Sequence, residues 1–289
     1  MKNLLLLSFC LLSLCIRCQN APLLESKAIK KTDTIASVKS EAGIVLPSEN
    51  QAYPIAVQKL MKAYPGHFSG YENNQLIWKD GTKMPLEDGR KDKTFSQLIN
   101  ESDLEDQVLS MTYPKGMNAP KPKQKEDPGR VRYEPFFKKM YGASAEAVKK
   151  NLTTIVWLPK TMNVKLQVTT VNDIHKKMQE ISNRLDTMPH LHKYLKNPGG
   201  TFMWRNIAGT DRLSMHSFGM TIDVNVEFSD YWRWAIKEEE GDGTRVIEYK
   251  NRIPLELVEI FESYGFIWGG KWYHYDTMHF EYRPELLTD

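Results

Sequence analysis

The feature that most constrains this chain is one apolar stripe on an otherwise polar segment. Val171, Ile174, Met178, Ile181 and Leu185 recur at spacings of three and four residues. This period predicts an amphipathic helix from Val171 to about Leu185, with one face turned toward a core.

Two further helices and five short strands are predicted around this helix. One helix runs from about Pro254 to Tyr264, where Pro254 suits the first turn and Gly265 can end it in the left-handed conformation. The other spans 52–63. The strand candidates are β-branched or aromatic segments with turn signals beside them: 153–158, 164–168, 201–207, 221–226 and 279–283.

Because helices and strands do not alternate strictly, the order favours an α+β domain with a small, largely antiparallel sheet covered by helices. The run from Tyr113 to Arg130 contains four prolines and is predicted to be an extended surface loop. We expect 51–289 to form a single domain and the protein to be a monomer.

Composition excludes some classes of protein. With 289 residues, 41% hydrophobic and 11% aromatic, the chain can bury a substantial core. Its formal charge of +3 falls close to neutral without the basic residues of the first twenty positions, so no nucleic-acid partner is predicted.

The N-terminus has the parts of an export signal: Lys2, an apolar run from Leu4 to Ile16, and polar sequence from Arg17. We assign residues 1–20 to this signal and 21–50 to a flexible tether. The apolar run is too short for a transmembrane helix, and no other stretch is apolar for long enough. The mature protein is expected in the periplasm or cell envelope, without a transmembrane segment.

All three cysteines, Cys10, Cys15 and Cys18, lie in or beside this leader. The mature chain therefore keeps no disulfide and no thiolate metal site, so any zinc must use histidine and carboxylate ligands. Cys15 or Cys18 could instead carry a lipid anchor, although Leu14 and Arg17 stand where a small residue is expected.

Two C-terminal segments carry candidate ligands of this kind. In the first, His216 and Asp223 flank Gly219, which allows a turn before the strand at 221. In the second, Asp276 and His279 are three residues apart after a Trp-Gly-Gly loop. Zinc hydrolysis needs three protein ligands and a carboxylate that takes a proton from water, and two histidines with two aspartates can supply that set.

This combined pattern resembles the VanY-type D-alanyl-D-alanine carboxypeptidases and the related L-alanyl-D-glutamate endopeptidases of the cell wall. The resemblance covers about 201–287 and implies a zinc peptidase core at about 153–289, with a fold of the Hedgehog/DD-peptidase type and an N-terminal extension at 51–152. It implies zinc ligands at His216, Asp223 and His279, and Asp276 as general base. Ser214 would orient a ligand or the substrate.

The family also uses an arginine to hold the substrate. Its usual sequence context is missing, so Arg205 is the best substitute and Arg212 the alternative. Glu281 and His274 are further candidates beside the ligands; His274 could touch substrate, replace a ligand, or be a surface histidine. Tyr231, Trp232 and Trp234, followed by 237–242, form either a substrate wall or a small satellite core.

The resemblance implies hydrolysis of a peptide bond in peptidoglycan stems. Two alternatives stay open: a non-catalytic wall-binding protein that keeps the fold, and a zinc hydrolase of another amide. The motifs do not separate carboxypeptidase from endopeptidase, or cleavage of a D,D bond from cleavage of an L,D bond.

Overall fold

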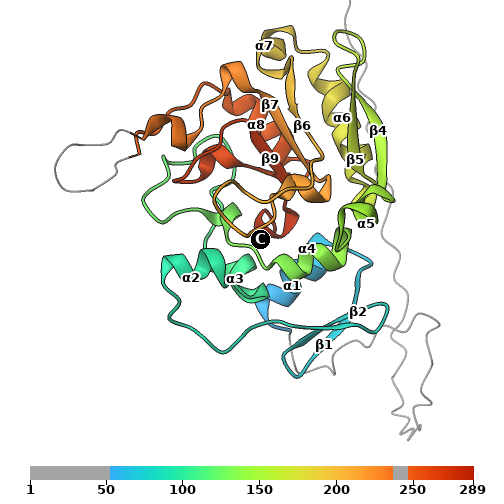
Figure 1. Ribbon diagram of the computed structural model, residues 1–289, viewed down its shortest axis with the longest axis vertical. Coiled ribbons are helices and arrows are strands. Elements are labelled where there is room, and N and C mark those ends of the chain that lie inside the picture. The colour runs from blue at the N-terminus through green and yellow to red at the C-terminus, as the bar shows by residue number, and fades with distance from the viewer. Residues whose placement is uncertain (1–52, 237–246) are drawn as a thin grey trace, which may run out of the picture. The chain divides into compact units, whose positions relative to one another are not determined.

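Three small antiparallel sheets with helices around them make up the part of the chain that we describe, residues 53–236 and 247–289 of a computed structural model (Figure 1). These residues belong to one compact unit, 43–289. The predicted signal and tether lie outside the described residues. The architecture is α+β, as the sequence predicts.

The sheet that carries the site has four strands in the order β6-β7-β9-β8. Their bounds are β6 Pro198–Gly200, β7 Thr221–Asn225, β8 Phe266–Trp268 and β9 His279–Tyr282. All three pairings are antiparallel, and in the central pair Asp223 lies directly opposite His279. Helix α8 (Leu255–Glu262) packs on β8 and α7 (His192–Leu195) on β7.

A two-stranded sheet, β4 (Leu152–Trp157) and β5 (Val164–Thr169), packs against α6 (Ile174–Leu185), and the three lie together in Figure 1. The predicted stripe of α6 is buried, with Met178 and Ile181 fully covered. Polar contacts fix the same face, since Ser182 accepts a hydrogen bond from the backbone N–H of Leu158 at 2.7 Å. The amphipathic helix is therefore confirmed.

The N-terminal part, described here for residues 53–151, contains the third sheet and five α-helices. The strands are β1 Phe68–Glu72, β2 Gln75–Trp78 and β3 Lys83–Pro85; the helices are α1 Ile55–Ala63, α2 Phe95–Asn100, α3 Leu104–Leu109, α4 Glu134–Tyr141 and α5 Ala145–Lys149. One hydrophobic cluster includes Leu60 of α1 and Phe280 of β9, so this part shares a core with the site-bearing sheet.

Two expectations from the sequence are wrong. Residues 201–207 form no strand; their backbone pairs with residues 212–216 through scattered hydrogen bonds and one isolated bridge, between Asn206 and Leu213, which is too irregular for a ladder. The run from Tyr113 to Arg130 is not on the surface throughout. Tyr113 is buried, and so are Asp127 to Gly129 at its end, in and beside the short 3-10 helix η1 (Pro128–Arg130).

Within residues 53–236 and 247–289, no helix has the length and apolar character needed to cross a membrane.

Candidate active site

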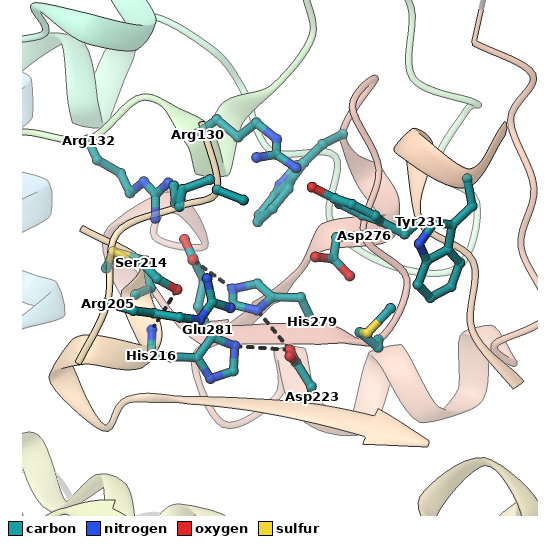
Figure 2. A pocket seen from close by; sticks show the side chains of 16 residues that line it. Arg130, Arg132, Arg205, Ser214, His216, Asp223, Tyr231, Asp276, His279 and Glu281 are labelled. Atoms are coloured by element: carbon teal, nitrogen blue, oxygen red, sulfur yellow. Dashed lines mark hydrogen bonds and ion pairs between the residues drawn. The ribbon is translucent and has the colours of Figure 1, made fainter. Parts of the chain in front are cut away.

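Three predicted ligands converge on one point from separate elements. Asp223 lies on β7, His279 starts β9, and His216 comes from the 3-10 helix η4 (Met215–Phe218). One oxygen of Asp223 lies 3.1 Å from His216 Nε2 and 3.0 Å from His279 Nδ1 (Figure 2). The three ligand atoms all lie within 4.8 Å of one another. These spacings are close to those between ligands that share one ion through bonds of about 2.0–2.2 Å.

The outer nitrogen of each imidazole is held by an acceptor. His216 Nδ1 lies 3.1 Å from the carbonyl of Thr201, and His279 Nε2 lies 3.0 Å from Glu281. These acceptors fix the ring orientations and leave Nε2 of His216 and Nδ1 of His279 for a metal. The residues therefore fit a zinc ion in both donor type and orientation.

The two histidines shift the pKa of Asp223, and Asp223 in turn shifts the pKa of His279. Burial alone would raise the pKa of Asp223, but the charge and hydrogen bond of His216 hold it well below its ordinary value. Burial would lower the pKa of His279, yet its hydrogen bonds to Asp223 and Glu281 raise it to about 10. A metal that binds Nδ1 must displace this proton, so metal affinity should fall at low pH.

Asp276 faces the metal-binding group from the loop before β9 (Figure 2). Its Oδ1 is buried and has no hydrogen-bond partner among the described residues. Burial, and then the charge of Asp223, raise the pKa of Asp276 to about 6. An unpartnered carboxylate in this position can accept a proton close to neutral pH.

Glycines allow the two turns that bring these side chains together. Gly219 has φ of 65°, and a Cβ there would lie 2.6 Å from Leu152. A Cβ on Gly269 would lie 2.5 Å from the carbonyl oxygen of Asp276, whose N–H donates back to Gly269 at 3.0 Å. Both close approaches require the absence of a side chain.

The pocket around the ligands has a volume of about 320 Å³ and is lined by three arginines: Arg130, Arg132 and Arg205. Arg132 makes no hydrogen bond or ion pair with the described residues, and burial beside Arg212 lowers its pKa to about 9. Figure 2 shows Arg130 and Arg132 across the pocket from His216 and Asp223. Arg130 lies over the Trp272 ring at 5.1 Å.

Sequence reasoning missed Arg130 and Arg132 because Arg130 ends, and Arg132 follows, a segment that was expected on the surface, far upstream of the motifs. Gly129 was the one local signal. A Cβ there would lie 2.2 Å from the Trp272 ring, so this backbone must pass close to the Trp-Gly-Gly loop.

Of the expected arginines, Arg205 lines the pocket but is exposed, and among the described residues its guanidinium bonds only the neighbouring Asn206 carbonyl, at 3.3 Å. Arg212 is not among the residues that line this pocket. Its guanidinium donates to the Arg130 carbonyl at 2.5 Å, so it braces the segment that carries Arg130.

The remaining candidates lie in different surroundings. Ser214 lines the pocket and caps η4, accepting a hydrogen bond from the His216 N–H at 3.4 Å. His274 is not part of the ligand group, because its Nδ1 is bound to Asp127 at 2.6 Å.

Glu281 connects the ligands to a buried charge network. Its second oxygen accepts from Arg283 at 3.1 Å, and Arg283 donates to Glu285 at 2.6 Å. Tyr64 of the N-terminal part donates to Glu285, also at 2.6 Å. Burial would raise the pKa of Glu281, but the His279 hydrogen bond and nearby arginines lower it to about 2. The N-terminal part therefore supports the residues that hold His279.

Tyr231 and Trp234 line the pocket, which favours the substrate wall over the satellite core for these two rings. The sequence analysis included residues 237–242 in this wall, and they lie outside the described residues, which end at Ile236 before this gap.

A histidine–aspartate–histidine group with a free carboxylate beside it, in an α+β fold, is typical of metal-dependent hydrolases. Residues 208–282 match the family model described as D-alanyl-D-alanine carboxypeptidase. This match confirms the resemblance for that segment of the chain. His216, Asp223, Asp276 and His279 all lie within the matched segment, whereas Arg130, Arg132 and Arg205 lie before it. Comparisons with curated proteins and with solved structures gave no match.

Proposed function

We propose that this protein is an exported, monomeric zinc peptidase that hydrolyses a peptide bond in peptidoglycan stem peptides. The observation that carries the proposal is the convergence of His216, Asp223 and His279 beside the unpartnered Asp276, within the segment that matches the peptidase family. His216, Asp223 and His279 would hold the ion. When bound, zinc supplies a Lewis acid and lowers the pKa of a bound water toward about 7.

Asp276 is the proposed general base. Its buried carboxylate is ionised at neutral pH, and it takes a proton from the attacking water. Once protonated, it can deliver that proton to the amine that leaves when the peptide bond breaks. Because Oδ1 has no competing donor among the described residues, it is free for both transfers.

Arg132 is proposed to hold the developing oxyanion or a substrate carboxylate. Arg132 lines the pocket, and its guanidinium donates no hydrogen bond to any described residue. A partly desolvated guanidinium binds a planar carboxylate with two parallel hydrogen bonds, which fixes the substrate. Arg205 is proposed as an outer contact, since it is exposed at the same pocket.

Digestion of purified peptidoglycan, followed by mass analysis of the released fragments, tests the function. We expect stem fragments from the protein with zinc and none after treatment with a chelator. Binding to the wall without any release would instead favour the non-catalytic alternative, and hydrolysis of unrelated amides at equal rates would favour a broader hydrolase.

Two variants separate the roles of ligand and base. His216→Ala should lose zinc, as measured by metal analysis after dialysis. Asp276→Asn should keep zinc but lose turnover by at least about 100-fold, the usual contribution of general acid–base catalysis. Full activity in Asp276→Asn would disprove the assigned base.

A further inference from the structure

A second pocket lies beside the active site. It has a volume of about 260 Å³, and its lining includes four rings, Phe95, Trp232, Tyr273 and His274, together with Gln124 and Lys125. These residues come from α2, from the run before η1, from the segment after β7 and from the loop before β9. The pocket is therefore built by distant parts of the chain.

The two pockets share structural elements. His274 is two residues before Asp276, and its carbonyl accepts hydrogen bonds from Arg130, which lines the first pocket. Tyr231 lines the first pocket and Trp232 the second, with ring centroids 6.0 Å apart. A ligand in the second pocket therefore lies next to the proposed reaction centre.

The rings of the second pocket are arranged around His274. Phe95 stacks on it at 6.2 Å with an interplanar angle of 24°, while Trp232 and Tyr273 meet it edge-on at 4.7 and 5.1 Å. Such contacts fix the orientation of each ring. The result is a set of flat apolar faces in a concave site.

Two polar groups among these rings have capacity for a ligand. Asp127 is fully buried and binds both the backbone N–H and Nδ1 of His274, at 2.8 and 2.6 Å. This leaves Nε2 as the polar atom of the ring that has no partner among the described residues. Trp232 Nε1 is buried and unpartnered among the described residues. Buried polar groups of this kind normally have a hydrogen-bond partner.

We propose that this second pocket binds an uncharged sugar ring of the glycan strand to which the stem peptide is attached. A sugar ring offers C–H faces that pack on aromatic rings and hydroxyl and amide groups that satisfy buried donors and acceptors. A stem peptide carries carboxylates, and these are matched by the arginines of the first pocket. The lining of the second pocket, in contrast, includes one lysine, Lys125, and no arginine.

This inference rests on the proposed function, and it indicates which peptide bond of the stem is hydrolysed. The first residue of a stem is joined to the sugar, and each further residue adds at most about 3.3–3.6 Å. The bond after the first residue therefore lies up to about 10 Å nearer the sugar than the bond after the fourth. Adjacent pockets for sugar and scissile bond favour cleavage close to the glycan, as in an L-alanyl-D-glutamate endopeptidase.

Glycan binding can be measured without any peptide. Calorimetric titration of the full protein with an oligomer of N-acetylglucosamine, in the presence of a chelator, should show binding. Phe95→Ala and Tyr273→Ala should each weaken it about two- to tenfold, the value of one aromatic contact. No helix residue of α2 is buried, so Phe95→Ala should fold. Ile99→Ala, on the same helix but outside the pocket lining, is the matched control and should bind like the parent protein.

Hydrolysis separates this inference from the proposed function. A stem peptide that carries its sugar should show a lower KM than the same stem without sugar, and Phe95→Ala should abolish this difference while turnover of the free stem stays unchanged. No binding of the oligomer, or equal effects of Phe95→Ala on both substrates, would overturn the sugar site; the second result would indicate a peptide in the pocket. If the oligomer binds but no stem is hydrolysed, the proposed function fails and the sugar site stands.

Discussion

Replacing Arg283 with methionine tests the buried charge network beneath the metal-binding group. Arg283, Glu281 and Glu285 are all fully buried, and the guanidinium donates to both carboxylates. Methionine keeps part of the apolar volume of the side chain but removes the charge. Because two carboxylates then lose a buried partner, we expect a loss of about 3–5 kcal/mol in the free energy of unfolding.

The assay is urea unfolding at pH 7 followed by tryptophan fluorescence, with a chelator present so that metal binding does not contribute. Lys176→Met is the control, because its ion pair with Asp173 is exposed and should matter little. If Arg283→Met lost no more stability than Lys176→Met, the buried network would not support the fold as we argue.

The effect should also depend on pH. The pKa of Glu281 is lowered from 4.5 to about 2, against the effect of burial, by His279, Arg132 and Arg283. A carboxylate with a lowered pKa contributes stability above its unfolded value, and this contribution is lost as the pH falls through the folded one. The gap between parent and variant should therefore be largest above pH 4.5 and shrink toward pH 2.

Three further outcomes are expected. Tyr64→Phe, which removes a hydroxyl that donates to a buried carboxylate at 2.6 Å, should cost about 1.5–3 kcal/mol in urea unfolding; no change would show that the hydrogen bond is not needed. Burial and the charge of a neighbouring aspartate raise the pKa of Asp276 to about 6, and a bound cation can only lower it. We therefore expect kcat/KM to fall as the pH decreases at or below about pH 6. A fall that begins above pH 7 would contradict Asp276 as the base. Gly219→Ala should cost at least about 1–2 kcal/mol in thermal unfolding and more than Gly81→Ala, because both have positive φ but only Gly219 lacks room beside Leu152; equal losses would exclude that contact as the cause.

The sequence predicted much of the local structure. The stripe on α6 specified a helix with a buried face. Gly265, which follows α8 and has φ of 89°, marks the end of that helical region as expected. Boundaries were less accurate. Asn172 and Asp173 adopt left-handed conformations, so the α-helix begins at Ile174 rather than Val171. Asparagine and aspartate tolerate this conformation, and side-chain periodicity does not record it.

The candidate ligands could be selected from the sequence because each pair is local. His216 and Asp223 are joined by one turn, and Asp276 and His279 by another. What brought the two pairs together was the antiparallel pairing of β7 with β9, which places Asp223 opposite His279. That register depends on contacts between strands that are far apart in the chain.

By itself, the sequence determined the fold class and the donor types of the site, because short-range spacing expresses both. Only the tertiary structure decided that Arg130 and Arg132 line the pocket, that Glu281 is tied through Arg283 and Glu285 to Tyr64, and that a second aromatic pocket lies alongside. These features arise from packing between distant segments, and packing depends on the shape and burial of many side chains together, which no local spacing encodes.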